Sequence, residues 1–461
     1  MKRFDLNIEK ILENWGMHHA IREIIANALD EQLLTKTKDM EIFKNKNSWI
    51  IRDFGRGIKY THLTQNENQE KLSSVKVIGK FGIGLKDALA TFDRRGAVVT
   101  AKSKHTKIFI EKSPKQGFSD ISTLHAVISE PADASFIGTE FELQGVSDKD
   151  IEEAKNLFLI FSGEEILETM KKGQVIKRRG ASGNIYINGV KVAEEENFLF
   201  SYNITTLSAP IRKALNRERT NVGRSAYTDS IKKILLSSAT KEVAEILAND
   251  LTNISKGTAH DELSWIDVQE HSVKILNQLG KYLFITSFEG MQHPDMIDQA
   301  RNSGHEIITI PENLKQKIQN SNDLSGNPIT DIGQFISNYN DSFEFKIINP
   351  DELNKREKLI YQQTPDILNI FGGKPKKVDE IKISSTMRKD FFSEVETLGC
   401  WDEDTNSIIL SRKTLKIISD YSGILIHELI HAKTGDHDVT REFENSLTKE
   451  IGNLCSKLLE K

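Results

Sequence analysis

Two histidines and a glutamate near the end of the chain have a spacing that can bind a metal ion and move a proton. His427, Glu428 and His431 lie in the stretch ILIHELIHAKTG. On a helix, residues four apart share one face, so both imidazole rings can bind one zinc ion. Glu428 can then take a proton from a zinc-bound water. The pattern can arise by accident, but its flanks here are strongly apolar, where unused histidines would be costly.

A third metal ligand is expected from the segment that follows. In the next helical pattern, Glu444 lies roughly 60° from the centre of the apolar stripe and Glu442 roughly 140° away. Glu444 therefore points inward more naturally and is the expected ligand. Asp438 is the rival, with an alternative role as the cap of the helix. Cys400 is a weaker candidate, because its setting LGCW is that of a buried thiol.

A row of polar side chains runs along a helical pattern near the start of the chain. Glu23, Asn27 and Asp30 are spaced four and three residues apart within AIREIIANALDEQ. They form a stripe beside the apolar face that Ile21, Ile24 and Ala28 belong to. Taken alone, such a stripe is usually the solvated face of an amphipathic helix.

Two glycine-rich loops follow this helix. One contains Asp53, Gly55 and Gly57 directly after an apolar strand in IIRDFGRGIKY, and the other, IGKFGIGLKDALA, precedes a helix and contains Gly79, Gly82 and Gly84. Glycine permits positive φ and a close approach of the backbone, and the N–H groups at a helix start suit phosphate oxygens. Either loop alone is weak evidence for a phosphate-binding site, but the helix and the two loops in this order are stronger evidence.

This order resembles the nucleotide-binding domain of the GHKL ATPases, the superfamily of DNA gyrase, dimeric heat-shock chaperones, histidine kinases and MutL. The resemblance covers residues 15 to about 145 and includes GTEF at 138–141. It implies that Glu23 polarises the attacking water and that Asn27 binds Mg²⁺, while Asp30 braces the fold. Because histidine kinases commonly lack a residue equivalent to Glu23, its presence favours hydrolysis over phosphotransfer.

The same resemblance implies a set of nucleotide-binding residues. Asp53 would accept the adenine amino proton, with support from Thr139. The rest of the expected set comprises Gly55, Gly57, Gly82, Gly84 and Lys86. Gyrase-like and chaperone-like members send a cation from a second domain to the γ-phosphate. Arg217 and Arg219 are the candidates for that role, with Arg224 behind them, unless the stretch is a solvated basic loop.

The pattern of elements predicts a multidomain α+β protein. We expect a Bergerat-type ATP-binding α/β sandwich over 1–150 and a transducer-like α+β domain over 151–255, with a tight hairpin at Asn188-Gly189. A small α/β connector over 256–330 and a zincin-like domain over 331–461 follow. The strand expected at TNSIILSRKTL before the HExxH helix resembles the layout of zinc metallopeptidases. Breaks are expected at Gly423 and at 435–438.

Composition limits the possible functions. The 461 residues carry 62 Lys and Arg against 67 Asp and Glu, a net charge of −5, so no global positive field attracts nucleic acid or membrane. The two cysteines, Cys400 and Cys455, exclude a disulfide framework. The chain has no run approaching 18 apolar residues. These features predict a soluble cytoplasmic protein.

Together the patterns predict a GHKL ATPase that gates a zinc-dependent peptidase by nucleotide-driven closure or dimerisation. ATP, Mg²⁺ and Zn²⁺ are the expected cofactors. The expected partners are a protein substrate and a second copy of the chain, while nucleic acid stays open. The alternative is a chaperone-like or MutL/MORC-like, DNA-acting ATPase with a degenerate metal-binding tail. A zinc hydrolase that does not cleave peptides is a further possibility.

Overall fold

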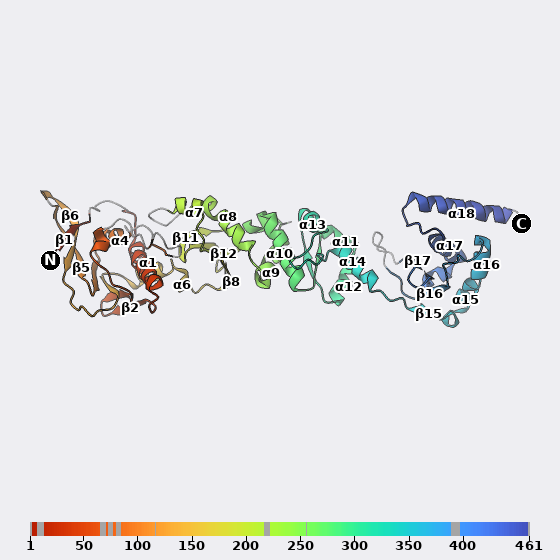
Figure 1. Cartoon of the computed structure of the whole chain (residues 1–461), viewed down its shortest axis with the longest axis horizontal. Coiled ribbons are helices and arrows are strands. Elements are labelled where there is room, and N and C mark those ends of the chain that lie inside the picture. Colours follow the sequence, from red (N-terminus) through yellow and green to blue (C-terminus); the bar gives the residue numbers. More distant parts are fainter. Residues whose placement is uncertain are drawn as a thin grey trace. The chain divides into compact units, whose positions relative to one another are not determined.

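The protein is α+β, with several sheets divided between two compact units, Met1–Leu279 and Gly280–Lys461. Figure 1 shows the elements of this computed structural model in chain order. Among the residues that it describes, no helix is long and apolar enough to cross a membrane. The described residues are 2–6, 13–64, 71, 77–79, 84–115, 117–215, 222–254, 256–388 and 397–459.

The first unit begins with an antiparallel sheet of seven strands in the order β1-β6-β5-β4-β7-β3-β2. Strand β3 lies between β2 and β7, so the loop after β3 starts beside the first residues of β7. The strands span Lys2–Asp5 (β1), Glu41–Asn45 (β2), Ser48–Arg52 (β3), Val98–Ser103 (β4), Lys107–Lys115 (β5), Phe118–Ser129 (β6) and Thr139–Gln144 (β7).

Within the described residues, the helices that cover this sheet or pack beside it are α1 (Met17–Thr35), α4 (Gly84–Arg94) and α5 (Asp148–Lys155), with the short α2 (Thr61–Thr64) nearby in the chain. Helix α1 packs against α4, α5 and β3. Its predicted apolar face is the buried one, since Ile21, Ile24 and Ala28 are at most 4% exposed. The core that they share with Phe92 and Leu143 fixes α1 and α4 against each other.

A second sheet of five strands follows in the order β11-β10-β12-β9-β8, with β10 and β12 parallel. The predicted hairpin is confirmed, because Asn188 (φ 48°) and Gly189 (φ 79°) join β10 to β11. Positive φ at both positions is typical of a type I′ turn. The strands are Ile166–Met170 (β8), Gly173–Lys177 (β9), Gly183–Ile187 (β10), Val190–Glu195 (β11) and Phe200–Ile204 (β12).

Helices complete the first unit. Helix α8 packs against β9 and β12, and α9 packs against α10 and β8. The helices are α6 (Leu159–Ser162), α7 (Ala209–Ala214), α8 (Arg224–Leu235), α9 (Lys241–Leu251), the 3₁₀ turn η1 (Asp261–Ser264) and α10 (Ile266–Leu279).

The second unit starts with two parallel strands, β13 (Tyr282–Ile285) and β14 (Glu306–Thr309). The boundary between the units thus falls inside the expected connector 256–330, and the finer division into four domains stays a prediction. The helices around these strands are α11 (Ser287–Gln292), α12 (Pro294–Asn302), α13 (Glu312–Ile318) and α14 (Ile332–Asp341).

The rest of the second unit surrounds a four-stranded sheet in the order β15-β16-β18-β17, so β17 is an edge strand. Helix α17 (Ile418–Thr434), which carries the HExxH residues, packs against β17 and β18 and buries Leu425 and Leu429. The other elements are β15 (Ile347–Ile348), η2 (Pro350–Glu352), α15 (Lys355–Tyr361), α16 (Thr364–Phe371), β16 (Glu380–Ser384), β17 (Gly399–Asp402), β18 (Ser407–Ser411), η3 (Arg412–Lys416) and α18 (Arg441–Leu459).

Candidate functional site

Glu23 is buried where α1 meets the start of α4. Its Oε1 accepts hydrogen bonds from Nε and Nη2 of Arg22 at 3.1 and 2.9 Å, and both residues are at most 3% exposed. A Cβ atom at Gly84 would lie 2.2 Å from Glu23 Oε2. Only glycine at this position lets the carboxylate lie against the first residue of α4.

Asn27 and Asp30 hold a single ammonium group. Lys71 Nζ donates to Asn27 Oδ1 at 3.0 Å and to Asp30 Oδ2 at 2.9 Å. Asp30 also accepts the backbone N–H groups of Ile78 and Gly79 at 2.6 and 2.8 Å. The Asn27 oxygen therefore already binds a cation, and Asp30 fixes the backbone at the first glycine of the second loop.

Asp53 and Thr139 meet where β3 ends and β7 begins. Asp53 Oδ1 accepts the backbone N–H groups of Gly55 at 2.9 Å and Thr139 at 3.2 Å. Burial raises the pKa of Asp53, while these hydrogen bonds oppose the shift. Gly138, at φ +81°, makes this crossing possible, because a Cβ there would lie 1.9 Å from the carbonyl oxygen of Asp53.

An ion pair that the sequence did not indicate lies beside this loop. Arg56 donates from its backbone N–H and Nε to Glu31 Oε1 at 2.8 and 2.9 Å, and from Nη2 to Glu31 Oε2 at 2.9 Å. A Cβ at Gly55 would lie 2.3 Å from Glu31 Cγ. Glycine at 55 thus makes room for the pair, while Gly57 adopts φ +85°. Nothing in the spacing distinguishes Glu31 from a solvated helix residue.

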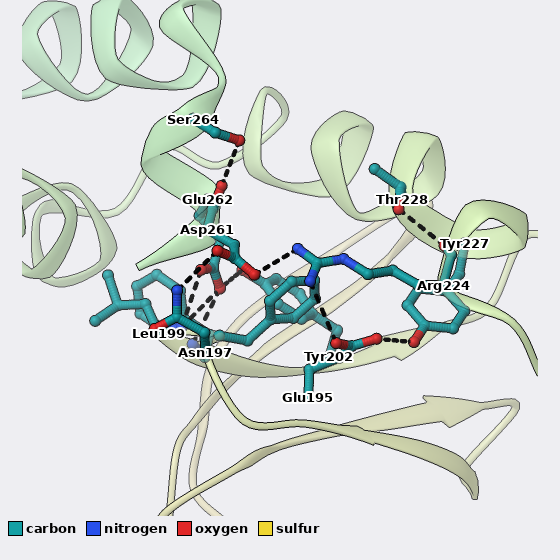
Figure 2. Close-up of polar contacts among 12 residues, drawn as sticks. Glu195, Asn197, Leu199, Tyr202, Arg224, Tyr227, Thr228, Asp261, Glu262 and Ser264 are labelled. Carbon is teal, nitrogen blue, oxygen red and sulfur yellow. Dashed lines mark hydrogen bonds and ion pairs between the residues drawn. The ribbon is translucent and has the colours of Figure 1, made fainter. Parts of the chain in front are cut away.

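The remaining nucleotide-site expectations have mixed outcomes. Lys86 is 8% exposed on α4, with its Nζ 5.8 Å from the centre of the Phe4 ring. Arg224 forms ion pairs with Asp261 of η1 at 2.6 Å and Glu195 of β11 at 3.5 Å, so both elements hold it. Figure 2 shows this cluster. Gly82, Arg217 and Arg219 lie outside the described residues.

Helix α17 and the loop after it bring three metal-ligating atoms together. His427 Nε2 and His431 Nε2 lie 3.1 Å apart, and Asp438 Oδ1 is 3.1 Å from the first and 3.2 Å from the second. His431 Nδ1 lies 2.7 Å from the carbonyl oxygen of Asp436. A carbonyl only accepts, so Nδ1 carries the proton and Nε2 is left to bind a metal. Burial lowers the pKa of His427, which favours the neutral ring that metal binding requires.

The expected third ligand Glu444 is not part of this cluster. Within the described part of the chain, the group that could hold a metal comprises His427, His431 and Asp438. Glu444 and Glu442 are exposed on α18. The face that α18 turns to the histidines carries Phe443, which stacks on His431 at 4.2 Å between ring centres. An aromatic ring therefore occupies the inward position, and the loop supplies the carboxylate.

The structure also bears on two alternatives, Asp438 as a helix cap and Cys400 as a metal ligand. Thr440 caps α18, since its Oγ1 accepts the backbone N–H of Phe443 at 3.2 Å, so Asp438 is not needed as a cap. Burial raises the pKa of the Cys400 thiol to about 11, which disfavours the thiolate that binds metal.

Glu428 lies beneath the histidines against the edge strand β17. It is 7% exposed, and a Cβ at Gly399 would lie 2.6 Å from its Oε1. Burial, followed by the charge of Asp438, raises its pKa to about 8. A carboxyl group with such a pKa can both take and give a proton near neutral pH.

Comparisons with known proteins identify relatives in one bacterium. The family model described as the Mycoplasma pneumoniae MPN635 N-terminal domain matches residues 149–241. An uncharacterized protein of Mycoplasma pneumoniae is 40% identical over 247 residues, which are 52% of this chain and 99% of that protein. A second uncharacterized protein of that bacterium is 25% identical over 340 residues, covering 68% of this chain and 93% of its own length.

Among solved structures, the 43K ATPase domain of Thermus thermophilus gyrase B, in complex with an aminocoumarin, gives a TM-score of 0.20 at 15% identity. The match covers 38% of this chain and 61% of that chain, less than two thirds of its length. The sequence match that covers 99% of the first Mycoplasma relative is the one that shows the family of this chain. This chain belongs to the family of that Mycoplasma pneumoniae protein.

Proposed function

We propose that the first unit binds and hydrolyses ATP in the manner of the GHKL ATPases. The observation that carries the proposal is the placing of Glu23, Asn27 and Asp53 by α1, the start of α4 and the β3–β7 crossing. Glu23 lies against Gly84, Asn27 Oδ1 accepts a hydrogen bond from Lys71, and Asp53 accepts the N–H of Thr139, so segments that are distant in sequence meet around these three residues.

The residues divide the work of hydrolysis among them. The Asp53 carboxylate accepts a hydrogen bond from the amino group of the adenine base. The backbone N–H of Thr139 donates to Asp53 and fixes the orientation of that carboxylate. Asn27 Oδ1, which holds the Lys71 ammonium, suits Mg²⁺ because hard cations prefer oxygen ligands. Glu23 takes a proton from the attacking water as the bond to the γ-phosphate forms and the bond to the leaving phosphate oxygen breaks.

A paired substitution tests this assignment. Glu23→Ala would leave the guanidinium of buried Arg22 without its carboxylate, a change that can unfold a protein. Glu23→Gln keeps an acceptor for Arg22 but cannot take a proton. It should bind Mg-ATP as the wild type does and hydrolyse it about a hundredfold or more slowly.

The control is Glu111→Gln, because Glu111 also pairs with an arginine, Arg3 at 2.9 Å, and lies on β5 outside the residues proposed to bind the nucleotide. It should keep wild-type turnover. Asn27→Ala should lose Mg-dependent binding and turnover together. Equal hydrolysis by wild type and Glu23→Gln would remove the ATPase assignment.

We propose further that the second unit is a zinc-dependent peptidase. The observation that favours it is the convergence of His427, His431 and Asp438 above the buried Glu428. Two imidazoles and one carboxylate are the donor set of many catalytic zinc sites, and bound zinc would acidify a water molecule there. Glu428 would accept that proton and pass it to the leaving amine of a peptide.

Glu428→Gln separates this peptidase from a metal site that is only structural. The amide keeps the shape of the side chain but cannot carry the proton. The variant should retain zinc and lose peptide hydrolysis by the wild type. A zinc-loaded wild type that cleaves no peptide, and that binds DNA in a salt-sensitive way, would favour the DNA-acting ATPase with a structural metal tail.

A further inference from the structure

Residues 77–79, which lead into the second glycine loop, are held by side chains from two segments that are distant in sequence. Asp30 of α1 accepts the N–H groups of Ile78 and Gly79 at 2.6 and 2.8 Å. From the hairpin of the second sheet, Asn188 Nδ2 donates to the carbonyl oxygen of Val77 at 3.3 Å. Three consecutive backbone units are thus tied to α1 on one side and to the hairpin on the other.

The hairpin tip is itself fixed, so it can act as a support. The backbone N–H of Asn188 donates to Ile204 at 3.0 Å, and that of Gly189 donates to Asn203 Oδ1 at 2.9 Å. The carbonyl oxygen of Gly189 accepts the N–H of Leu159 at 2.9 Å. These bonds join the tip to β12 and to the start of α6.

The geometry of the turn does not explain why the Asn188 carboxamide contacts Val77. Asn-Gly is the preferred pair for a type I′ turn because both residues tolerate positive φ, and glycine would serve there equally well. The carboxamide, however, extends to Val77, which is 1% exposed. A feature that turn geometry does not require therefore contacts the segment that leads into the glycine loop.

The contact lies beside a cleft, so it is a point of attachment rather than part of a packed interface. Leu29, Asp30, Ile78, Phe158 and Asn188 are among the residues that line this cleft of about 470 Å³. A polar contact beside a cleft can be made or lost with less repacking than one inside a core. Its loss therefore changes where the backbone of residues 77–79 lies more than it changes the stability of the fold.

We propose that Asn188 is a positioning residue for ATP hydrolysis, which acts through the Val77 carbonyl to fix the backbone at Gly79. The inference rests on the proposed function, in which Gly79 begins the loop that holds the phosphates. Asn188 donates to Val77, which leads into the second glycine loop, whereas Asp53 and Thr139, proposed to bind adenine, lie at the β3–β7 crossing. It should therefore affect turnover more than nucleotide affinity.

Two substitutions keep the turn and remove the donor. Asn188→Gly tolerates positive φ, and Asn188→Asp keeps the size but presents a carboxylate to a carbonyl oxygen. The matched control is Asn406→Gly, at a residue with the same left-handed conformation (φ 49°) between β17 and β18. Hydrogen exchange followed by mass spectrometry should show faster exchange of Ile78 and Gly79 in both Asn188 variants and no change there in the control.

Steady-state kinetics supply the second measurement. Both Asn188 variants should lower kcat about two- to tenfold, the size expected from one hydrogen bond, and leave KM within about twofold. Unchanged exchange at 78–79, an unchanged kcat, or an effect on KM alone would each overturn the proposal. If the wild type binds no ATP, the proposed function fails, whereas the exchange experiment still decides whether Asn188 fixes residues 77–79.

Discussion

Val439 has the least favourable backbone conformation beside the candidate metal site. This β-branched residue adopts φ 63° and is 98% exposed, between the candidate ligand Asp438 and the cap Thr440. The left-handed conformation costs a residue with a Cβ about 1–2 kcal/mol, and an exposed side chain offsets none of it by packing. The strain is therefore stored in the loop that carries Asp438, the carboxylate proposed to bind zinc.

Val439→Gly should consequently stabilise the protein. Relief of the strain exceeds the added entropy of the unfolded chain, which costs about 0.4–1 kcal/mol. The net gain should raise the apparent unfolding temperature of the second unit by about 1–4 °C. Val98→Gly is the control, because Val98 is also exposed but lies in extended strand β4. That change should destabilise the first unit, and destabilisation by Val439→Gly would show that the conformation carries no strain.

Elemental analysis of purified variants tests the choice of the third zinc ligand. The wild type should hold one zinc per chain after dialysis, and Asp438→Ala should lose it, because Asp438 is the carboxylate that the described part of the chain places with the two histidines. Glu444→Ala and Glu442→Ala should keep it, since both residues are exposed on α18. Zinc lost from Glu444→Ala but kept by Asp438→Ala would restore the ligand that helix periodicity favoured.

The metal site shows how far single residues can be predicted from the sequence. Periodicity correctly placed Phe443 inward on α18, because that face packs on α17. It could not place Asp438, whose position depends on the loop after Gly435, where φ is 77°. Arg224, expected behind the two candidate arginines, pairs with Asp261 and Glu195, which its own stretch of sequence does not indicate. Contacts between residues from distant segments cannot be predicted from the spacing of residues along the sequence.

At the level of elements, one buried carboxylate joins η1 to β12. Glu262 is 0% exposed and accepts the N–H groups of Leu199 at 2.9 Å and Phe200 at 3.2 Å, and the hydroxyl of Tyr202 at 2.8 Å (Figure 2). Burial raises its pKa above the ordinary 4.5, although the hydrogen bonds oppose the shift. The join between the second sheet and the helices after it is therefore sensitive to pH.

The direction of this sensitivity follows from proton linkage. The folded state binds the Glu262 proton more tightly than the unfolded state, so the resulting stabilisation is complete below about pH 4.5 and is lost as pH rises through the raised pKa. Glu262→Gln has no proton to lose. Its apparent unfolding temperature should be lower than that of the wild type and should fall less steeply from pH 4.5 upward.

Glu168 is the control with the opposite sign. Burial alone would raise its pKa, but hydrogen bonds from Ser238, Ala239 and Thr240 hold the pKa below its ordinary value. Its contribution is present above about pH 4.5 and is lost as pH falls through the lowered pKa. Glu168→Gln should therefore reduce the loss of stability on acidification. The same pH slope in Glu262→Gln and wild type would contradict the account of η1.

The elements themselves were easier to predict than their ends. The Asn188-Gly189 hairpin and the burial of Ile21, Ile24 and Ala28 follow from turn chemistry and from helical period. The break expected at Gly423 was wrong, because α17 runs without interruption from Ile418 to Thr434. A single glycine costs a helix only about 1 kcal/mol, and the burial of Leu425 and Leu429 outweighs that cost.

For the whole molecule, composition and length predicted several cores but not where the chain divides. The boundary at Leu279/Gly280 separates α10 from β13, although both segments were expected to belong to one connector domain over 256–330. Their separation depends on tertiary contacts, since α10 packs on α9 and η1, whereas β13 pairs with β14. The pattern of helix followed by strand is the same whether or not a boundary lies between them.

ATP should also change the number of chains in the assembly. GHKL proteins commonly dimerise when nucleotide closes their ATP-binding domains, so a saturating non-hydrolysable ATP analogue should double the mass seen by light scattering. Asp53→Ala should stay at the mass of the nucleotide-free protein, because it removes the carboxylate proposed to hold the base. An unchanged wild-type mass at saturation would leave the gating expected from the sequence without its mechanical step.

Thermodynamic linkage between the two units tests gating directly. Mg-ATP at a hundredfold excess over its Kd should stabilise the first unit by about 2.7 kcal/mol, and zinc should act in the same way on the second unit. If the sites are coupled, each ligand must change the affinity of the other by the same factor, typically about 5- to 150-fold. We therefore expect the Kd of Mg-ATP, measured by calorimetry, to differ between the zinc-loaded wild type and Asp438→Ala, with Glu444→Ala matching the wild type. Equal values in all three proteins would mean that the units bind their ligands independently, and an ATPase with a structural metal tail would then be the better description.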